Sequence, residues 1–132
     1  MEQSNSVVLR QVFEAFAKGD IPTVLGAMDA NIVWEEPDAP GHPWGGTTRG
    51  PNGVLNGVFM PIGGNFEQFE VKADELIDYG NRVFAVGHVD AKARATGKTF
   101  VMPFVFIVSF EDNKITRFQV YENAAMIIEA LK

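Results

Sequence analysis

Three ionisable side chains are candidates for proton transfer: Glu36, His42 and Glu122. Glu36 directly precedes a proline, in a stretch that also contains both tryptophans of the chain. A carboxylate in a cavity lined by Trp and Phe loses hydration, so its pKa rises and it becomes a useful base near neutral pH. We therefore predict that Glu36 is the catalytic base. The alternatives are a carboxylate in solvent at the edge of a loop and one that caps a helix.

The two histidines of the chain have different surroundings. His42 lies in a loop rich in Gly and Pro and could titrate near neutrality as an acid–base partner of Glu36, or it could be an exposed loop imidazole. His88 lies beside Asp90 in a predicted strand, which favours a surface or dimer contact. Glu122 ends the last predicted strand on its inward face, so we expect it at the cavity rim, assisting Glu36.

Other kinds of site find little support. The chain has no cysteine, which excludes disulfides, thiolate catalysis and zinc–thiolate sites. Glu36, His42 and Glu122 are the only set that could ligate a metal, and no spacing motif supports it, so we predict no metal and no cofactor. The pairs at 45–46 and 63–64 are glycines without a following Lys-Ser/Thr, so neither is a phosphate loop.

The bulk composition describes a small acidic globular protein. The 132 residues fit one domain, predicted over 1–132, and 11 basic against 17 acidic side chains give a net charge of −6. This charge argues against nucleic acid as a partner. We find neither an apolar run long enough to span a membrane nor a signal peptide, so we predict a cytoplasmic protein without a membrane partner.

The aromatic residues indicate an apolar pocket. The chain has 11 Phe and 2 Trp but only 2 Tyr, and Phe adds apolar area without a hydrogen-bonding group. Either a dense core or a cavity for an apolar ligand would use such residues. The candidate ligand-binding residues are Trp34, Trp44, Phe59, Met102, Phe104, Phe106, Phe118 and Val120.

The first half of the chain is predicted to be helical. The apolar spacing predicts a first helix that ends at Lys18-Gly19, a second capped by Asp20, and a third after Pro51. Between them we expect a short apolar piece at 32–34 and an irregular loop at 38–50. The inward-facing residues are, in turn, Leu9, Val12, Phe13 and Phe16; Ile21, Val24, Leu25 and Met28; and Val54, Leu55, Val58, Phe59 and Ile62.

The second half alternates with a period of two and predicts four antiparallel strands. The first strand ends at a turn after Tyr79, and the other three span 82–95, 99–110 and 114–121. Asn123 then caps a short terminal helix. The fold class is α+β: N-terminal helices packed on a curved, mostly antiparallel sheet form a cone that encloses a pocket.

Alternation also sorts each strand into two faces. Small residues from Val83 to Ala93 suit a cavity wall or a close helix contact, and an aromatic row on the next strand faces the helices. The opposite row, Val101, Pro103, Val105 and Ile107, is apolar and needs a cover, so we predict a homodimer through the outer face of the sheet. On the last strand Phe118 points inward and Ile115 outward.

Several segments together resemble the SnoaL-like branch of the nuclear-transport-factor-2-like superfamily, which is related to ketosteroid isomerase and limonene-epoxide hydrolase. The resemblance covers nearly the whole chain and implies a cystatin-like α+β roll. The segments are Ala-Lys-Gly-Asp at 17–20, Trp-Glu-Glu-Pro at 34–37, Pro-Trp-Gly-Gly-Thr-Thr-Arg-Gly at 43–50, Thr-Gly-Lys at 96–98, Asn-Lys-Ile-Thr-Arg at 113–117 and Tyr-Glu-Asn at 121–123.

The catalytic groups of these relatives are only partly matched. Glu36 stands where the isomerase has its base, whereas Val12 and Phe106 stand at the positions of its oxyanion-hole Tyr and Asp. The positions of the epoxide-hydrolase triad correspond to Gly87, Val89 and Val120. The resemblance therefore implies neither of these two reactions.

The sequence favours a pocket protein that binds a mostly apolar small molecule. If it is an enzyme, we expect a metal-free isomerase, cyclase, or hydratase or hydrolase that uses acid–base chemistry. The alternatives are a non-catalytic ligand-binding or accessory dimerisation module, and an interaction domain whose cavity is incidental.

Overall fold

A six-stranded curved sheet forms the body of the computed structural model, which describes residues 3–132. The strand order is β2-β1-β6-β5-β4-β3, and every neighbouring pair is antiparallel except β1 and β6. The strands are β1 (Met28–Glu36), β2 (Gly46–Arg49), β3 (Phe66–Tyr79), β4 (Arg82–Ala93), β5 (Thr99–Glu111) and β6 (Lys114–Glu122). The predicted α+β class is confirmed.

Two strands of this sheet were not predicted. The apolar piece at 32–34 lies within β1, and the loop at 38–50 contains β2, so the prediction of only four antiparallel strands is wrong. The register of β1 on β6 shifts between Met28 and Val33, which interrupts the regular alternation by which a strand is recognised. Met28, predicted on the second helix, instead opens β1.

The first two helices form where the capping residues predict them. In α1 (Asn5–Ala17), the side chain of Ser4 accepts a hydrogen bond from the Val7 N–H at 3.3 Å. Gly19, with φ of +73°, then takes the left-handed conformation that a residue with a side chain rarely adopts. Asp20 caps α2 (Ile21–Gly26) by accepting a hydrogen bond from the Thr23 N–H.

The predicted third helix is interrupted by a π-helical turn. It consists of α3 (Gly50–Val54), the π turn η1 (Leu55–Phe59) and α4 (Met60–Asn65). Three of its predicted inward residues, Val54, Val58 and Ile62, are buried. The wider turn adds one residue per turn, so both Val58 and Phe59 reach the interior of the molecule. Asn123 caps the terminal helix α5 (Ala124–Ala130), as predicted.

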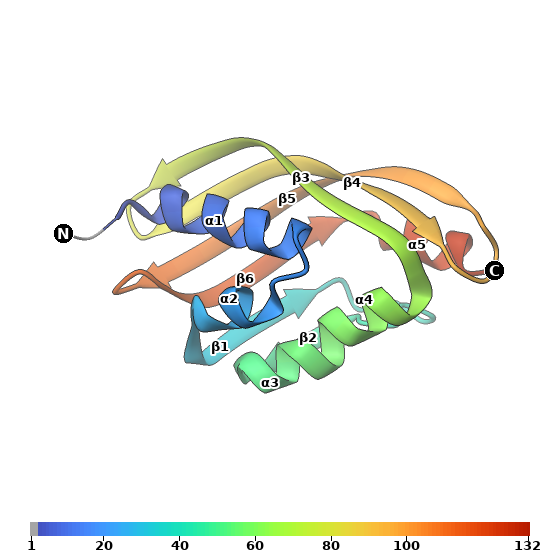
Figure 1. Cartoon of the computed structure of the whole chain (residues 1–132), viewed down its shortest axis with the longest axis horizontal. Helices are drawn as coiled ribbons and strands as arrows, with labels where there is room; N and C mark the ends of the chain where they lie inside the picture. Colours follow the sequence, from blue (N-terminus) through green and yellow to red (C-terminus); the bar gives the residue numbers. More distant parts are fainter. Residues whose placement is uncertain (1–2) are drawn as a thin grey trace.

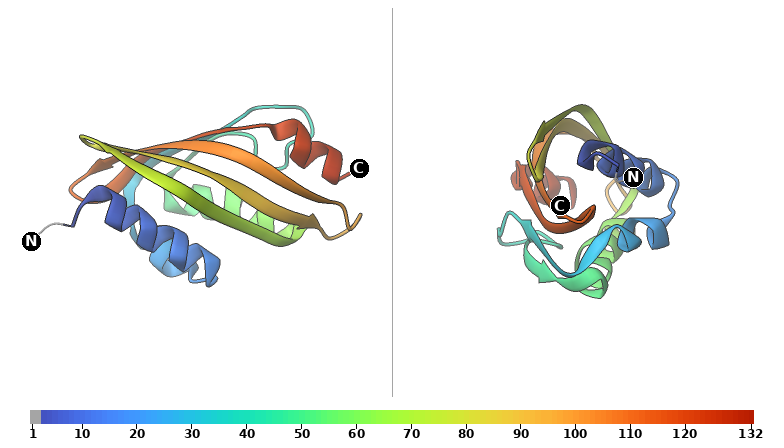
Figure 2. Two further views of the ribbon diagram at one scale, coloured as in Figure 1. Left: turned by 90° about the horizontal axis from the view of Figure 1, so that it is seen from above. Right: turned by 90° about the vertical axis from the view of Figure 1, so that its left-hand side faces the viewer.

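The helices α1 to α4 cover the concave face of the sheet (Figure 1), and the end-on view shows sheet and helices arranged around a common interior (Figure 2). The row from Val83 to Ala93 on β4 faces this interior, as predicted, and Val101 and Val105 of β5 are exposed on the outer face. The prediction that Ile115 points outward is wrong. Ile115 is buried in the core, because the register of β5 on β6 shifts between Ser109 and Phe110.

Candidate functional site

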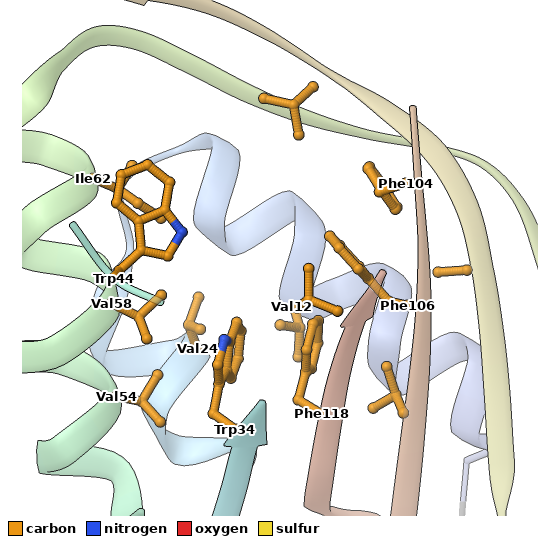
Figure 3. Close-up of a cluster of buried hydrophobic side chains, with 14 of the residues drawn as sticks. Val12, Val24, Trp34, Trp44, Val54, Val58, Ile62, Phe104, Phe106 and Phe118 are labelled. Atoms are coloured by element: carbon orange, nitrogen blue, oxygen red, sulfur yellow. The ribbon is translucent and has the colours of Figure 1, made fainter. Parts of the chain in front are cut away.

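An aromatic cavity lies between the sheet and the helices (Figure 3). The centre of a water molecule can occupy a volume of about 60 Å³ within this cavity. This volume accommodates a few waters or one small ring. Its walls are apolar except for two carboxylates. The residues that line it are Val12, Phe13, Phe16, Val24, Met28, Trp34, Glu36, Trp44, Val58, Phe59, Ile62, Phe69, Val71, Val89, Phe106, Ile115, Phe118, Val120 and Glu122.

Six of the eight predicted ligand-binding residues lie on this wall: Trp34, Trp44, Phe59, Phe106, Phe118 and Val120. The other two, Met102 and Phe104, are buried on the same face of β5 but do not line the cavity. Phe104 stacks on Phe106 with ring centroids 3.8 Å apart, so it supports the wall from behind.

Glu36 lies at the end of β1, with its side chain only 4% exposed. Its Oε2 accepts a hydrogen bond of 2.7 Å from the indole Nε1–H of Trp34, two residues earlier on the same face of the strand. Trp34 in turn stacks on Phe118 of β6, with ring centroids 3.9 Å apart and planes 2° from parallel. The carboxylate is therefore held by a side chain that is itself fixed by packing.

Glu122 approaches Glu36 because β1 and β6 run in parallel. Trp34 pairs with Phe118 and Glu35 with Gln119, so the final residues of both strands meet at one end of the cavity. Burial raises the pKa of Glu36 well above its ordinary value, and the nearby charge of Glu122 adds to this rise. Burial raises the pKa of Glu122 to about 7. The two carboxyl groups therefore titrate as a coupled pair, and each keeps its proton to a higher pH than an exposed glutamate does.

His42 lies behind Glu36 rather than on the cavity wall, with its side chain fully buried. A turn of the loop between β1 and β2 holds it, since His42 N–H donates to the carbonyl of Ala39 and Gly45 N–H donates to the carbonyl of His42. Its ring packs edge-on against Trp44 at 4.9 Å. Burial lowers the pKa of His42, and the charge of Asp38 opposes this.

A ligating atom from each of Glu36, His42 and Glu122 lies within 4.8 Å of the others, so the three side chains are close enough to hold a metal ion if each offers a lone pair. The His42 atom that faces Glu36 is Nε2, while Nδ1 accepts a hydrogen bond of 3.3 Å from the Trp44 N–H. A neutral ring whose Nδ1 accepts carries its hydrogen on Nε2. His42 thus presents a hydrogen rather than a lone pair, which does not fit metal binding at this atom.

His88, predicted to make a surface or dimer contact, lies on the outer face of the sheet. Its Nδ1 is 2.9 Å from Asp74 Oδ2 and its Nε2 is 3.7 Å from Asp90 Oδ2, and Lys72 binds Asp90 at 2.8 Å. This cluster is separate from the cavity.

Sequence reasoning missed one contact of the site and predicted another without its structural basis. The bond between Trp34 and Glu36 could have been expected, because residues two apart on a strand share a face. Glu122 was predicted to assist Glu36, but the approach of the two carboxylates could not be derived from the sequence, because it depends on a parallel contact between the first and the last strand of the chain, β1 and β6.

Comparisons with known proteins agree on the fold. The SnoaL-like domain family matches residues 9–118. No curated protein matches the sequence significantly. None of the helices in the described part of the chain is long and apolar enough to cross a membrane.

Three solved structures illustrate the structural likeness. An NTF2-like protein of unknown function from Burkholderia pseudomallei K96243 is 25% identical, with a TM-score of 0.91 and 99% of each chain covered. TerC, co-crystallised with polyporic acid, is 23% identical, with a TM-score of 0.87 over 96% of this chain and 97% of TerC. A hypothetical protein with a ketosteroid isomerase-like fold from Catenulispora acidiphila DSM 44928, in complex with trimethylamine, is 15% identical, with a TM-score of 0.74 over 86% and 83%.

Proposed function

Because this chain belongs to the SnoaL-like domain family and has two carboxylates at the wall of an aromatic cavity, we propose that it binds a small, mostly apolar molecule and transfers a proton on it. The observation that carries this proposal is the buried pair Glu36 and Glu122. Buried carboxyl groups with raised pKa values are costly to stability and recur where a protein performs acid–base chemistry.

Moving a proton from one atom of a ligand to another requires one group that accepts a proton and one that donates a proton, and the two carboxyl groups can supply both. When it holds one proton, the ionised carboxylate accepts a proton from a carbon of the ligand, and the protonated carboxyl donates its own proton to an oxygen or another carbon. One proton enters the pair and one leaves, so the net charge of the site is the same after each turnover. Isomerisation and aldol-type cyclisation include such a step, and in hydration the carboxylate takes the proton from the attacking water instead.

The size of the cavity limits the ligand to a single small ring or its open-chain equivalent, unless side chains move. Two of the structural neighbours were crystallised with small organic molecules, polyporic acid and trimethylamine. Those ligands support a small-molecule site in this chain as well.

Hydrogen–deuterium exchange of a small cyclic ketone tests the catalytic proposal. Cyclopentanone in D₂O is expected to lose the signal of its protons next to the carbonyl faster with the protein than without it, followed by NMR. Glu36→Gln and Glu122→Gln are each expected to slow this exchange about 100-fold or more. Glu35→Gln is the matched control, because Glu35 lies on the same strand but pairs with Arg117 on the surface, and it should leave the rate unchanged.

The second candidate function is binding without catalysis. Its support is the depth of both carboxylates, since a buried, protonated carboxyl also serves as a hydrogen-bond donor to a ligand. Binding of cyclopentanone, measured by tryptophan fluorescence, without accelerated exchange would favour this function over the enzymatic one.

We also propose that two copies of the chain pair through the outer face of the sheet. Val101 is 58% exposed and Val105 37% exposed there, beside the exposed Val86 and Tyr121. A contiguous apolar face of this kind is a hazard for a monomer and a suitable centre for a dimer interface.

The double variant Val101→Glu/Val105→Glu is expected to convert a dimer into a monomer, because each copy then places two charges in an apolar interface. Light scattering at about 50 µM measures the change. Val7→Glu is the control, since Val7 is 44% exposed on α1, which lies on the opposite side of the sheet from the proposed interface. A wild-type monomer at this concentration would contradict the proposal.

A further inference from the structure

Two polar atoms in the interior face each other without a hydrogen-bond partner. Nε2 of His42 lies 4.0 Å from Oε1 of Glu36, and neither atom is hydrogen-bonded or exposed. Unsatisfied buried groups are rare in native proteins, and each one calls for a physical reason. The separation is just beyond the usual length of a hydrogen bond, which is about 2.7 to 3.2 Å.

The backbone fixes which ring nitrogen of His42 carries hydrogen. Nδ1 accepts from the Trp44 N–H, an arrangement available only to a ring without hydrogen on Nδ1. Protonation of the ring would place two N–H groups against one another in a buried turn. The turn therefore favours a neutral His42 with its hydrogen on Nε2, directed at Glu36.

The charges around His42 and Glu36 are all acidic. Asp38 lies in the same loop as His42, and Glu122 reaches Glu36 from β6. None of the ion pairs found within residues 3–132 joins Glu36 or Glu122 to a lysine or an arginine. When Glu36 loses its proton, its Oε2 is stabilised by the Trp34 N–H, and the Trp44 indole also favours the ionised form. Nε2 of His42 is an unpartnered donor that faces Oε1.

We propose that His42 is a positioning residue that stays neutral, keeps its hydrogen on Nε2, and donates it to Oε1 of Glu36 whenever Glu36 is ionised. No proton is transferred between the two side chains. The histidine acts as a fixed donor, as Trp34 does for the other oxygen, and the 4.0 Å gap closes by about 1 Å when the carboxylate forms.

This inference deepens the proposed function. The hydrogen bond between His42 and Glu36 does not depend on that function, but its role in proton transfer does. Two N–H donors on one carboxylate make the ionised form of Glu36 accessible despite its burial, and so set the pH range in which the carboxyl pair can act as a base. In this role His42 controls the base without touching the ligand.

NMR of ¹⁵N-labelled protein tests the tautomer directly. The chain has only two histidines, so His42 and His88 are readily distinguished with a His88→Gln variant. The expected pattern for His42 is a neutral ring with hydrogen on Nε2 from pH 6 to pH 8. Hydrogen on Nδ1, or on both nitrogens at neutral pH, would overturn the proposal.

Two substitutions separate the role of His42 as a hydrogen-bond donor to Glu36 from its role as an acceptor that holds the turn. His42→Asn keeps an acceptor for the Trp44 N–H but is too short to reach Glu36, whereas His42→Gln places an amide N–H near the position of Nε2. The Asn variant is expected to raise the carboxyl titration midpoint of Glu36 by about one pH unit, a tenfold fall in its acid dissociation constant. The Gln variant should recover most of this change.

The titration is followed through the ¹³C carboxyl signals, with Glu36→Gln used to assign Glu36. Equal midpoints in the wild type and the Asn variant would overturn the proposal. If the Asn variant does not fold, the wild-type tautomer alone decides. Neither measurement needs a substrate. If the protein does not accelerate the exchange of cyclopentanone, the catalytic proposal is contradicted, but the inference about His42 is not.

Discussion

Replacing Glu122 with glutamine is expected to stabilise the protein at pH 8 by up to about 3 kcal/mol, and to change its stability little at pH 5. Glutamine keeps the shape of the side chain and removes its ionisation. Urea unfolding of the wild type and the variant at pH 5, 6, 7 and 8 measures the difference.

The sign follows from the direction of the pKa change. The pKa of Glu122 is about 7 in the folded protein and near 4.5 when unfolded, so between these pH values the folded state retains a proton that the unfolded state releases. Stability from this group is complete below pH 4.5 and is lost as the pH rises through 7. The pKa of Glu36 is also raised, so Glu36→Gln should act in the same direction.

Glu35→Gln is again the matched control. Glu35 pairs with Arg117 at 2.7 Å on the surface, so its loss should cost no more than about 1 kcal/mol, with a pH dependence like that of the wild type. If Glu122→Gln also follows the wild type from pH 5 to pH 8, then Glu122 is hydrated in solution, and the pair at the cavity wall is not the buried acid described above.

Gly87→Ala is expected to destabilise the protein by about 3 kcal/mol or more. A methyl group at this inward position would overlap the carbonyl oxygen of Lys72 on β3 and lie 2.7 Å from Cζ of Phe104. Relief would require a shift of the backbone of β3, next to the bulge between Ala73 and Glu75. Urea unfolding at a fixed pH measures the loss.

Gly63→Ala provides the comparison, because the added methyl group would meet nothing within 4 Å on α4. It should stabilise the protein by up to about 1 kcal/mol through helix propensity. If both variants had similar stability, β3 and β4 would be farther apart in solution than this structure places them.

Local residue patterns determined much of the architecture. The caps Asp20 and Asn123, the turn glycine Gly19 and the inward row on β4 were predicted and found, because each depends on neighbours within a few residues. The strand that ends at Glu36 was predicted only as a short apolar piece. Its alternation is broken by a register shift that no local pattern reveals.

The sequence alone identified Glu36, His42 and Glu122, by their residue types, as the ionisable groups that could act together. It also identified most of the aromatic wall, because the periodicity of strands and helices shows which side chains point inward. Only the tertiary structure decided how the three relate. The parallel contact of β1 and β6 brings Glu122 to Glu36, and the turn before β2 directs the Nε2 of His42 at the same carboxylate. The first contact joins strands far apart in the chain, and the second depends on the path of the irregular loop that follows β1. The pKa consequences of both follow from burial, which is a property of the whole fold.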